Sequence, residues 1–255
     1  VDLKSLAEEL GLHFFATPFE EWSADFLAEL DVPAFRIASG DLKNTPFLKH
    51  VAAFGKPIIL STGGGTMEDV RRASEAILAV NSQLAILQCT ATYPTEAEDL
   101  HLRCIEAFRR EFPEQVVGLS DHFNGIAMAV VSYVLGARII EKHFTLNHTW
   151  KGTDHALSLE PIGMRKMVRD LRRTRLALGS AEKAVRAKEL PAIEKMGKSL
   201  VAARELPAGI VIAVGDVVAK SPGGGLPPFE LERVIGRRLR ITLAADTPIS
   251  PEHLG

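Results

Sequence analysis

The feature that most constrains the fold is a repeated alternation of short apolar segments with helical patterns. Strands are predicted at residues 13–16, 34–38, 57–61, 84–89, 116–119 and 138–143. Each strand is followed by a predicted helix, at residues 20–30, 46–54, 67–80, 102–112, 125–135 and 161–178. Six successive strand–helix units predict an α/β fold with parallel strands and helical crossovers.

Polar residues favour a closed barrel over an open doubly wound sheet, because they follow every predicted strand. They are Thr17, Ser39-Gly40-Asp41, Ser61-Thr62-Gly63, residues 90–93, Ser120-Asp121-His122 and Glu141-Lys142-His143. Barrels collect chemistry from all strand ends, whereas open sheets concentrate it at one switch point. The chain also lacks a G-x-G-x-x-G motif. We therefore expect a (β/α)8 TIM barrel whose first two strands lie outside this sequence, with a helix over residues 1–10 as its second helix.

The composition changes after Gly179. Residues 181–197 are charged and interrupted by Pro191, which predicts a linker. Residues 198–255 contain short β-like pieces at 199–202, 211–212 and 239–242, separated by turns. The expected organisation is a catalytic domain at 1–180, a linker at 181–197 and a small β-rich domain at 198–255.

Composition argues against several partners. The net charge of −2 gives no support for a nucleic-acid partner. No apolar run approaches the roughly 18 residues of a membrane span, and the sequence does not open on a secretory signal, so neither a membrane span nor secretion is expected. Cys89 and Cys104 do not form a disulfide framework in a chain of this length, so reduced thiols in the cytoplasm are expected.

Two histidines end neighbouring predicted strands and form the candidate metal site. Strand residues alternate faces, so Ser120 shares a face with His122, and Glu141 shares a face with His143. Two imidazoles with substrate and water oxygens suit Mn²⁺ or Mg²⁺, although imidazole also suits zinc or iron. A single strand-end histidine is more often a packed residue, so the pair carries this prediction.

A second group of residues could bind phosphate or sugar. Lys56, Ser39, Ser120 and the Ser61-Thr62-Gly63 turn together form a candidate anion cradle, although each alone is ordinary turn chemistry. Tyr93 and Asp154 carry groups that can reach sugar hydroxyls. Their alternative roles are loop packing for Tyr93 and helix capping for Asp154.

Seven stretches of the chain resemble the sialic acid synthase (N-acetylneuraminate synthase) family, including its spore-coat polysaccharide branch. They are FFATPFEEWSADFLAEL, FRIASGDL, GKPIILSTGG, LQCTATYPT, VGLSDH, IIEKHFTL and GTDHALSLEP. KSLVAARELPAG and KSPGGGLPP resemble the family's antifreeze-like (SAF) C-terminal domain. The family condenses phosphoenolpyruvate with N-acetylmannosamine or a related sugar.

The resemblance implies a metal-dependent synthase that works as a domain-swapped homodimer, in which the SAF domain covers the partner's active site. It assigns His122 and His143 as metal ligands beside catalytic Glu141. It places Ser39, Lys56, Ser61, Thr62 and Ser120 near phosphoenolpyruvate, and Tyr93 and Asp154 near the sugar. The implied chemistry is attack of the phosphoenolpyruvate methylene carbon on a metal-polarised aldehyde. Water then adds and phosphate leaves.

Three positions depart from the family pattern. Ala91 replaces asparagine, Ser221 replaces an arginine, and Thr153 replaces a proline. All three lie on the sugar side, so we expect an acceptor other than N-acetylmannosamine. Two alternatives stay open: another phosphoenolpyruvate-aldose synthase, which would lack the C-terminal domain, and a non-catalytic carbohydrate-binding relative.

Overall fold

The computed structural model describes residues 2–255, so Val1 of the expected first helix lies outside the described residues. The chain divides into two compact units, Val1–Gly179 and Ser180–Gly255. Each unit has its own hydrophobic core. The two units are described separately below.

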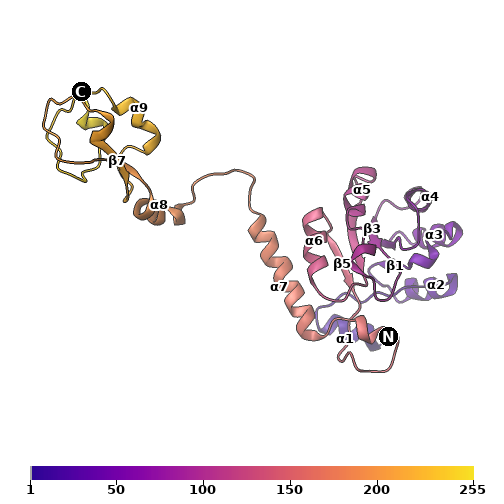
Figure 1. Cartoon of the computed structure of the whole chain (residues 1–255). Coiled ribbons are helices and arrows are strands. Elements are labelled where there is room, and N and C mark those ends of the chain that lie inside the picture. Colours follow the sequence, from indigo (N-terminus) through magenta and orange to yellow (C-terminus); the bar gives the residue numbers. More distant parts are fainter. Residues whose placement is uncertain (1) are drawn as a thin grey trace. The chain divides into compact units, whose positions relative to one another are not determined.

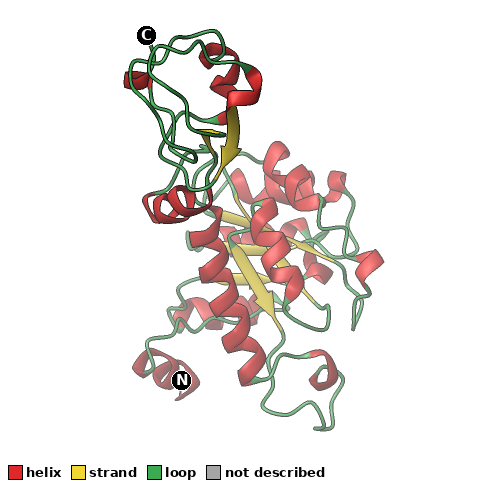
Figure 2. Cartoon of the chain, turned by 60° about the vertical axis from the view of Figure 1, so that its left-hand side comes forward, coloured by secondary structure: helices red, strands yellow, loops and turns green. Residues whose placement is uncertain are grey.

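The first unit is built on a five-stranded parallel sheet. Its strands are β1 (Phe35–Ile37), β2 (Ile58–Ser61), β3 (Leu84–Cys89), β4 (Val116–Asp121) and β5 (Ile139–Lys142). They are ordered β1-β2-β3-β4-β5, so the strand order never reverses as it does in a doubly wound sheet. Figure 1 shows these strands at the centre of the unit, and Figure 2 shows them side by side with helices outside them. The curled sheet is a half-barrel of the TIM type, which confirms the predicted fold class.

Seven α-helices lie among residues 2–179. They are α1 (Asp2–Glu9), α2 (Glu21–Glu29), α3 (Thr45–Ala52), α4 (Met67–Leu78), α5 (Cys104–Glu111), α6 (Ala127–Leu135) and α7 (Pro161–Leu178). Local sequence explains several ends: Asn44 caps α3, a Thr66–Asp69 capping box begins α4, and Gly136 ends α6 with a φ of 114°. None of the described helices is long and apolar enough to cross a membrane.

The main core lies between the sheet and its helices. All six residues of β3 are buried, as expected for a parallel strand covered on both faces. Phe35 of β1 stacks on Phe54 with ring centroids 5.2 Å apart, which fixes the first strand against the segment after α3. This core supports the carboxyl ends of the strands, where the polar residues gather.

The strand predicted at residues 13–16 is wrong, because the segment forms no ladder with β1 or any other described strand. Phe14 packs against the main core, Phe15 and Thr17 line a cleft at the strand ends, and Ala16 does both. The segment therefore contributes to the core and to the cleft without strand pairing.

The second unit contains the antiparallel pair β6 (Ser199–Ala202) and β7 (Val217–Lys220) and the helices α8 (Leu190–Met196) and α9 (Leu231–Val234). The predicted strand at 199–202 is confirmed. The pieces at 211–212 and 239–242 form only isolated bridges, such as Val211 with Arg238. The predicted linker contains the helix α8. Pro191 does not break this helix, because it lies in the first turn, where its missing N–H costs nothing.

Candidate active site

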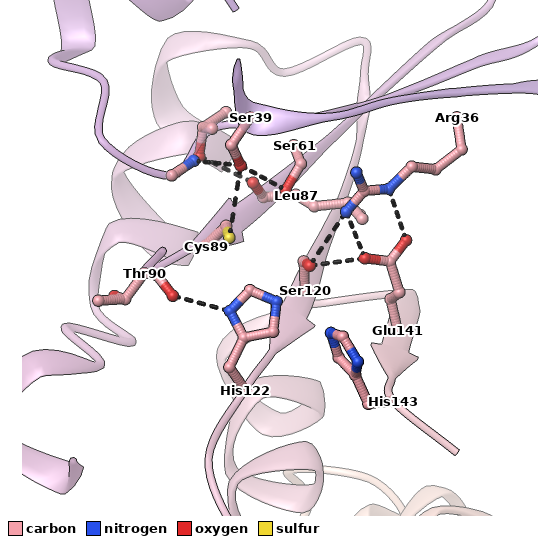
Figure 3. A network of polar contacts seen from close by, with 12 residues as sticks. Arg36, Ser39, Ser61, Leu87, Cys89, Thr90, Ser120, His122, Glu141 and His143 are labelled. Atoms are coloured by element: carbon pink, nitrogen blue, oxygen red, sulfur yellow. Dashed lines mark hydrogen bonds and ion pairs between the residues drawn. The ribbon is translucent and has the colours of Figure 1, made fainter. Parts of the chain in front are cut away.

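The register of β4 and β5 positions the site. Ser120 lies opposite Glu141, and Asp121 lies opposite Lys142. Because strand side chains alternate, Ser120 and Glu141 share one face, and the histidines that follow by two residues continue it. Figure 3 shows His122 and His143 facing each other at these strand ends.

The two imidazoles lie close together and are held by their neighbours. Their ring centroids are 5.3 Å apart, and the Tyr93 ring lies 4.1 Å from His122 and 5.8 Å from His143. His122 Nδ1 is 2.9 Å from the carbonyl oxygen of Thr90. A carbonyl only accepts, so Nδ1 carries the hydrogen and Nε2 is left with its lone pair. Burial, with a smaller contribution from His143, lowers the pKa of His122, which favours the neutral ring.

These nitrogen donors fit an open metal site better than a closed one. Among the described residues, no group of three or more histidine, cysteine, aspartate or glutamate side chains is arranged to hold a metal ion. A structural zinc site normally takes four protein ligands. Two imidazoles instead suit an ion that fills its remaining positions with water or substrate oxygens.

A charged network lies beside the histidines. Arg36 donates from Nε and Nη2 to the two Glu141 oxygens over 3.0 and 2.6 Å, and Ser120 Oγ donates to Glu141 over 2.6 Å. Burial alone would raise the pKa of Glu141, but these hydrogen bonds and the Arg36 charge hold it below its ordinary value. Glu141 is therefore an anion near neutral pH. The sequence prediction missed Arg36, although a lone charge inside the strand Phe-Arg-Ile was a usable signal.

The predicted serine cradle is partly assembled. Ser39 Oγ lies 3.1 Å from Ser61 Oγ and accepts a 2.9 Å hydrogen bond from the Gly63 N–H. A Cβ at Gly63 would lie 2.9 Å from both Ser39 Oγ and the Ala91 Cβ, so glycine is required for this close approach. Ala91 therefore borders the cradle directly.

Two predicted substrate-binding residues lie elsewhere. Lys56 precedes β2 and so lies at the amino end of the sheet, where its ammonium contacts Asp31 and the Val32 carbonyl oxygen. Thr62 is buried, and its hydroxyl donates to the Leu87 carbonyl over 2.8 Å. The structure does not bring Lys56 to the site, and it commits the Thr62 hydroxyl to a backbone contact.

The two histidines, Tyr93 and the Arg36–Glu141 pair surround a cleft of about 500 Å³. Its lining includes Phe15, Thr17, Phe19, Arg36, Tyr93, His122, Glu141 and His143. Asp154 borders His143, with 3.5 Å between Asp154 Oδ2 and His143 Nδ1. The cleft thus combines a cation, a carboxylate, two imidazoles and exposed aromatic rings.

Comparison with known proteins gives consistent matches along the whole chain. Residues 1–183 match the NeuB family and residues 197–255 match the SAF domain. N-acetylneuraminate-9-phosphate synthase from Mus musculus is 36% identical over 254 residues, covering 99% of this chain and 71% of that protein. N,N'-diacetyllegionaminic acid synthase from Legionella pneumophila is 35% identical over 257 residues, covering 99% and 72%.

A solved structure agrees in fold. The spore coat polysaccharide biosynthesis protein spsE from Bacillus subtilis superposes with a TM-score of 0.68 and 31% identity, covering all of this chain and 76% of that one. The family match covers well over half of the chain, and the relatives exceed 30% identity over most of their own length. The chain therefore belongs to the NeuB family and carries a SAF domain at residues 197–255.

Proposed function

We propose that this protein is a metal-dependent synthase that condenses phosphoenolpyruvate with an N-acylated aldose to give a nonulosonic (sialic-type) acid and phosphate. Its relatives are named as synthases of N-acetylneuraminate-9-phosphate, N,N'-diacetyllegionaminic acid and pseudaminic acid. The observation that carries the proposal is the pair of imidazoles 5.3 Å apart beside the Arg36–Glu141–Ser120 network. The spore-coat relative supports a role in surface polysaccharide synthesis.

The histidines are the proposed metal ligands. Mn²⁺ or Mg²⁺ held by His122 and His143 would supply Lewis-acid polarisation of the sugar aldehyde. The Thr90 carbonyl fixes the His122 ring so that its Nε2 faces away from that contact. The Tyr93 ring packs against both imidazoles, which restricts the orientation of the two rings.

Anion binding falls to the cradle and Arg36. Hydroxyls of Ser39 and Ser61 and the Gly63 N–H meet within hydrogen-bonding distance, which suits phosphate or carboxylate oxygens. The Arg36 guanidinium lines the cleft, and its donors that do not contact Glu141 can bind an anion there. Holding both reactants in one cleft supplies much of the expected acceleration.

The reaction balances with one water. The methylene carbon of phosphoenolpyruvate bonds to the aldehyde carbon, and the aldehyde oxygen takes up a proton. Water adds to the former enol carbon, and phosphate leaves. Glu141 is an anion that lines the cleft, so it is the residue suited to orient that water by accepting a hydrogen bond from it.

The sugar side determines the acceptor. Tyr93 and Asp154 border the two histidines and are the proposed sugar contacts. Ala91 borders the anion cradle, so the departures from the family pattern that bear on the sugar are Thr153, next to Asp154, and Ser221. On these we propose an acceptor other than N-acetylmannosamine. The test is phosphate release from phosphoenolpyruvate with a panel of N-acylated aldoses and Mn²⁺. Clear preference for N-acetylmannosamine would overturn the acceptor proposal, and no release with any aldose would overturn the activity.

We also propose a domain-swapped homodimer in the cytoplasm. Support comes from the separate core of the second unit, which does not need the first unit for its packing. Cys89 and Cys104 are both free thiols, as suits a reducing compartment. Light scattering on the eluting protein tests the dimer: a mass near 27.7 kDa, that of one chain, would contradict it.

A further inference from the structure

A fully buried ion pair is formed by the two residues that immediately precede the histidines in the chain. Lys142 Nζ is 3.1 Å from Asp121 Oδ2, and the two side chains are 1% and 0% exposed. In every other ion pair of residues 2–255, at least one side chain is more than 10% exposed. Among residues 2–255, Asp121 and Lys142 therefore form the only ion pair in which both charges are removed from water.

The pair ties together the backbone around both imidazoles. Asp121 Oδ1 accepts a 2.9 Å hydrogen bond from the Phe123 N–H, and Lys142 Nζ donates to the Phe123 carbonyl oxygen. Asp121 and Phe123 are the chain neighbours of His122, and Lys142 is the neighbour of His143. Two side chains and the backbone of one residue thus fix the end of β4 against the end of β5.

Stability alone gives a weak reason for such a pair. Moving two charges out of water costs several kcal/mol per ion, and well-packed apolar residues often replace buried pairs without loss. The register places Asp121 opposite Lys142, on the strand face that alternates with the face of Ser120 and Glu141. Lys142 is among the residues that line the cleft, but its side chain and that of Asp121 are buried. The two charged groups therefore face away from the cleft and can act on the histidines only through the backbone.

We propose that Asp121 and Lys142 are positioning residues that hold His122 and His143 at the separation required for joint metal binding. This inference rests on the proposed metal site. It assigns the pair no contact with substrate or metal. If the inference holds, losing the pair weakens metal affinity and loosens the strand ends even in a variant whose melting temperature is restored.

The test uses two variants of the full chain. Lys142→Met leaves a buried carboxylate without its cation and should lower the melting temperature. The double variant Asp121→Asn with Lys142→Met removes both charges, and the introduced amide keeps an oxygen acceptor for the Phe123 N–H. It removes the Lys142 donor to the Phe123 carbonyl and the link between the two strands. The double variant should recover most of the melting temperature. Arg71→Met, which breaks the exposed Arg71–Glu111 pair between α4 and α5, is the matched control.

Two readouts separate positioning from stability. The first is hydrogen exchange of the amides at 121–123 and 141–143 in metal-free protein, which should be faster in the double variant and unchanged in the control. The second is Mn²⁺ affinity by electron paramagnetic resonance, which should weaken about tenfold or more, as for other groups that orient ligands.

The outcomes also distinguish this inference from the proposed function. Wild-type exchange rates in the double variant would overturn the positioning role, whether or not Mn²⁺ binds. Mn²⁺ affinity that follows the melting temperature across all variants would overturn it as well. A wild-type protein that binds no Mn²⁺ would instead overturn the metal site, and the positioning role with it.

Discussion

Arg36 is the residue whose surroundings say most about the chemistry of the cleft. It lies in a strand of three residues whose other two side chains are fully buried in the core. Its side chain is 17% exposed and forms a bidentate pair with Glu141. A cation in this position is costly unless it is paired, and Glu141 supplies that pair. Because the guanidinium also lines the cleft, we expect it to contact an anionic substrate there.

Replacing Arg36 with methionine should therefore weaken phosphoenolpyruvate binding more than it slows turnover. Loss of a charge-assisted hydrogen bond worth about 1.5–3 kcal/mol corresponds to an increase in KM of roughly tenfold or more. Arg36→Lys keeps the charge but loses the planar fork, so an intermediate KM is expected. Steady-state kinetics at varied phosphoenolpyruvate checks this, and an unchanged KM in Arg36→Met would remove Arg36 from the anion site.

Thr62 illustrates a residue whose type suggested substrate binding but whose contacts are structural. Its hydroxyl bonds the Leu87 carbonyl inside the core. Thr62→Val should leave that carbonyl without its partner and cost about 1–3 kcal/mol of unfolding free energy, with little change in KM. Urea denaturation and kinetics on the same variant test this. A higher KM at unchanged stability would return Thr62 to the substrate contacts.

At the scale of elements, β4 is held close to its neighbours by a glycine. A Cβ at Gly118 would lie 2.5 Å from both the Ile139 carbonyl oxygen and Leu87 Cδ2. Gly118→Ala should therefore force β4 away from β3 or β5 and cost about 1–3 kcal/mol. Gly40→Ala is the control, because nothing lies within 4 Å of its Cβ position. Equal melting temperatures for the two variants would show that the sheet tolerates the extra atom.

The start of α4 gives a pH-dependent prediction. Hydrogen bonds from the Thr66 N–H and hydroxyl, with Arg72 and Lys43 nearby, hold the pKa of Asp69 well below its ordinary value. A lowered folded-state pKa contributes stability that is complete above the unfolded pKa of about 3.9 and is lost as pH falls below it. The melting temperature of wild type should exceed that of Asp69→Asn at pH 7, and the gap should narrow by pH 3. A gap independent of pH would mean that the Asp69 charge contributes nothing.

Much of the element order could be predicted from the sequence, because strands and helices of parallel α/β folds have distinct periodicities. Five of six predicted strands in the first unit form the sheet. Residues 13–16 show the limit of this reasoning, since alternation predicts an extended segment but strand pairing depends on a neighbour. Lys56 shows a second limit. A residue that flanks a strand in sequence reaches the site only if it lies at the carboxyl end of that strand, and Lys56 lies at the amino end of β2.

The site was predictable where strand position alone determines a side chain's face. Ser39, Ser61, Ser120, Glu141, His122 and His143 all reach the same end of the sheet. Arg36 and the buried Asp121–Lys142 pair were not predicted. Their roles depend on partners 105 and 21 residues away, which no local pattern contains.

At the scale of the whole molecule, the chain combines a half-barrel unit that holds the cleft with a C-terminal unit that has its own core. The cleft residues described above all come from the first unit. Metal binding by His122 and His143 is the central claim, because the proposed aldehyde activation depends on it. The claim is also testable without knowing the acceptor sugar.

The most direct measurement is Mn²⁺ binding by calorimetry to wild type, His122→Ala and His143→Ala, with His155→Ala as a control. His155 bonds Thr145 rather than lining the cleft, so its loss should not affect affinity. Wild type and the control should bind Mn²⁺ alike, with one ion per chain, and each of the other two variants should lose binding. Equal Mn²⁺ affinity in wild type and His122→Ala would contradict the account.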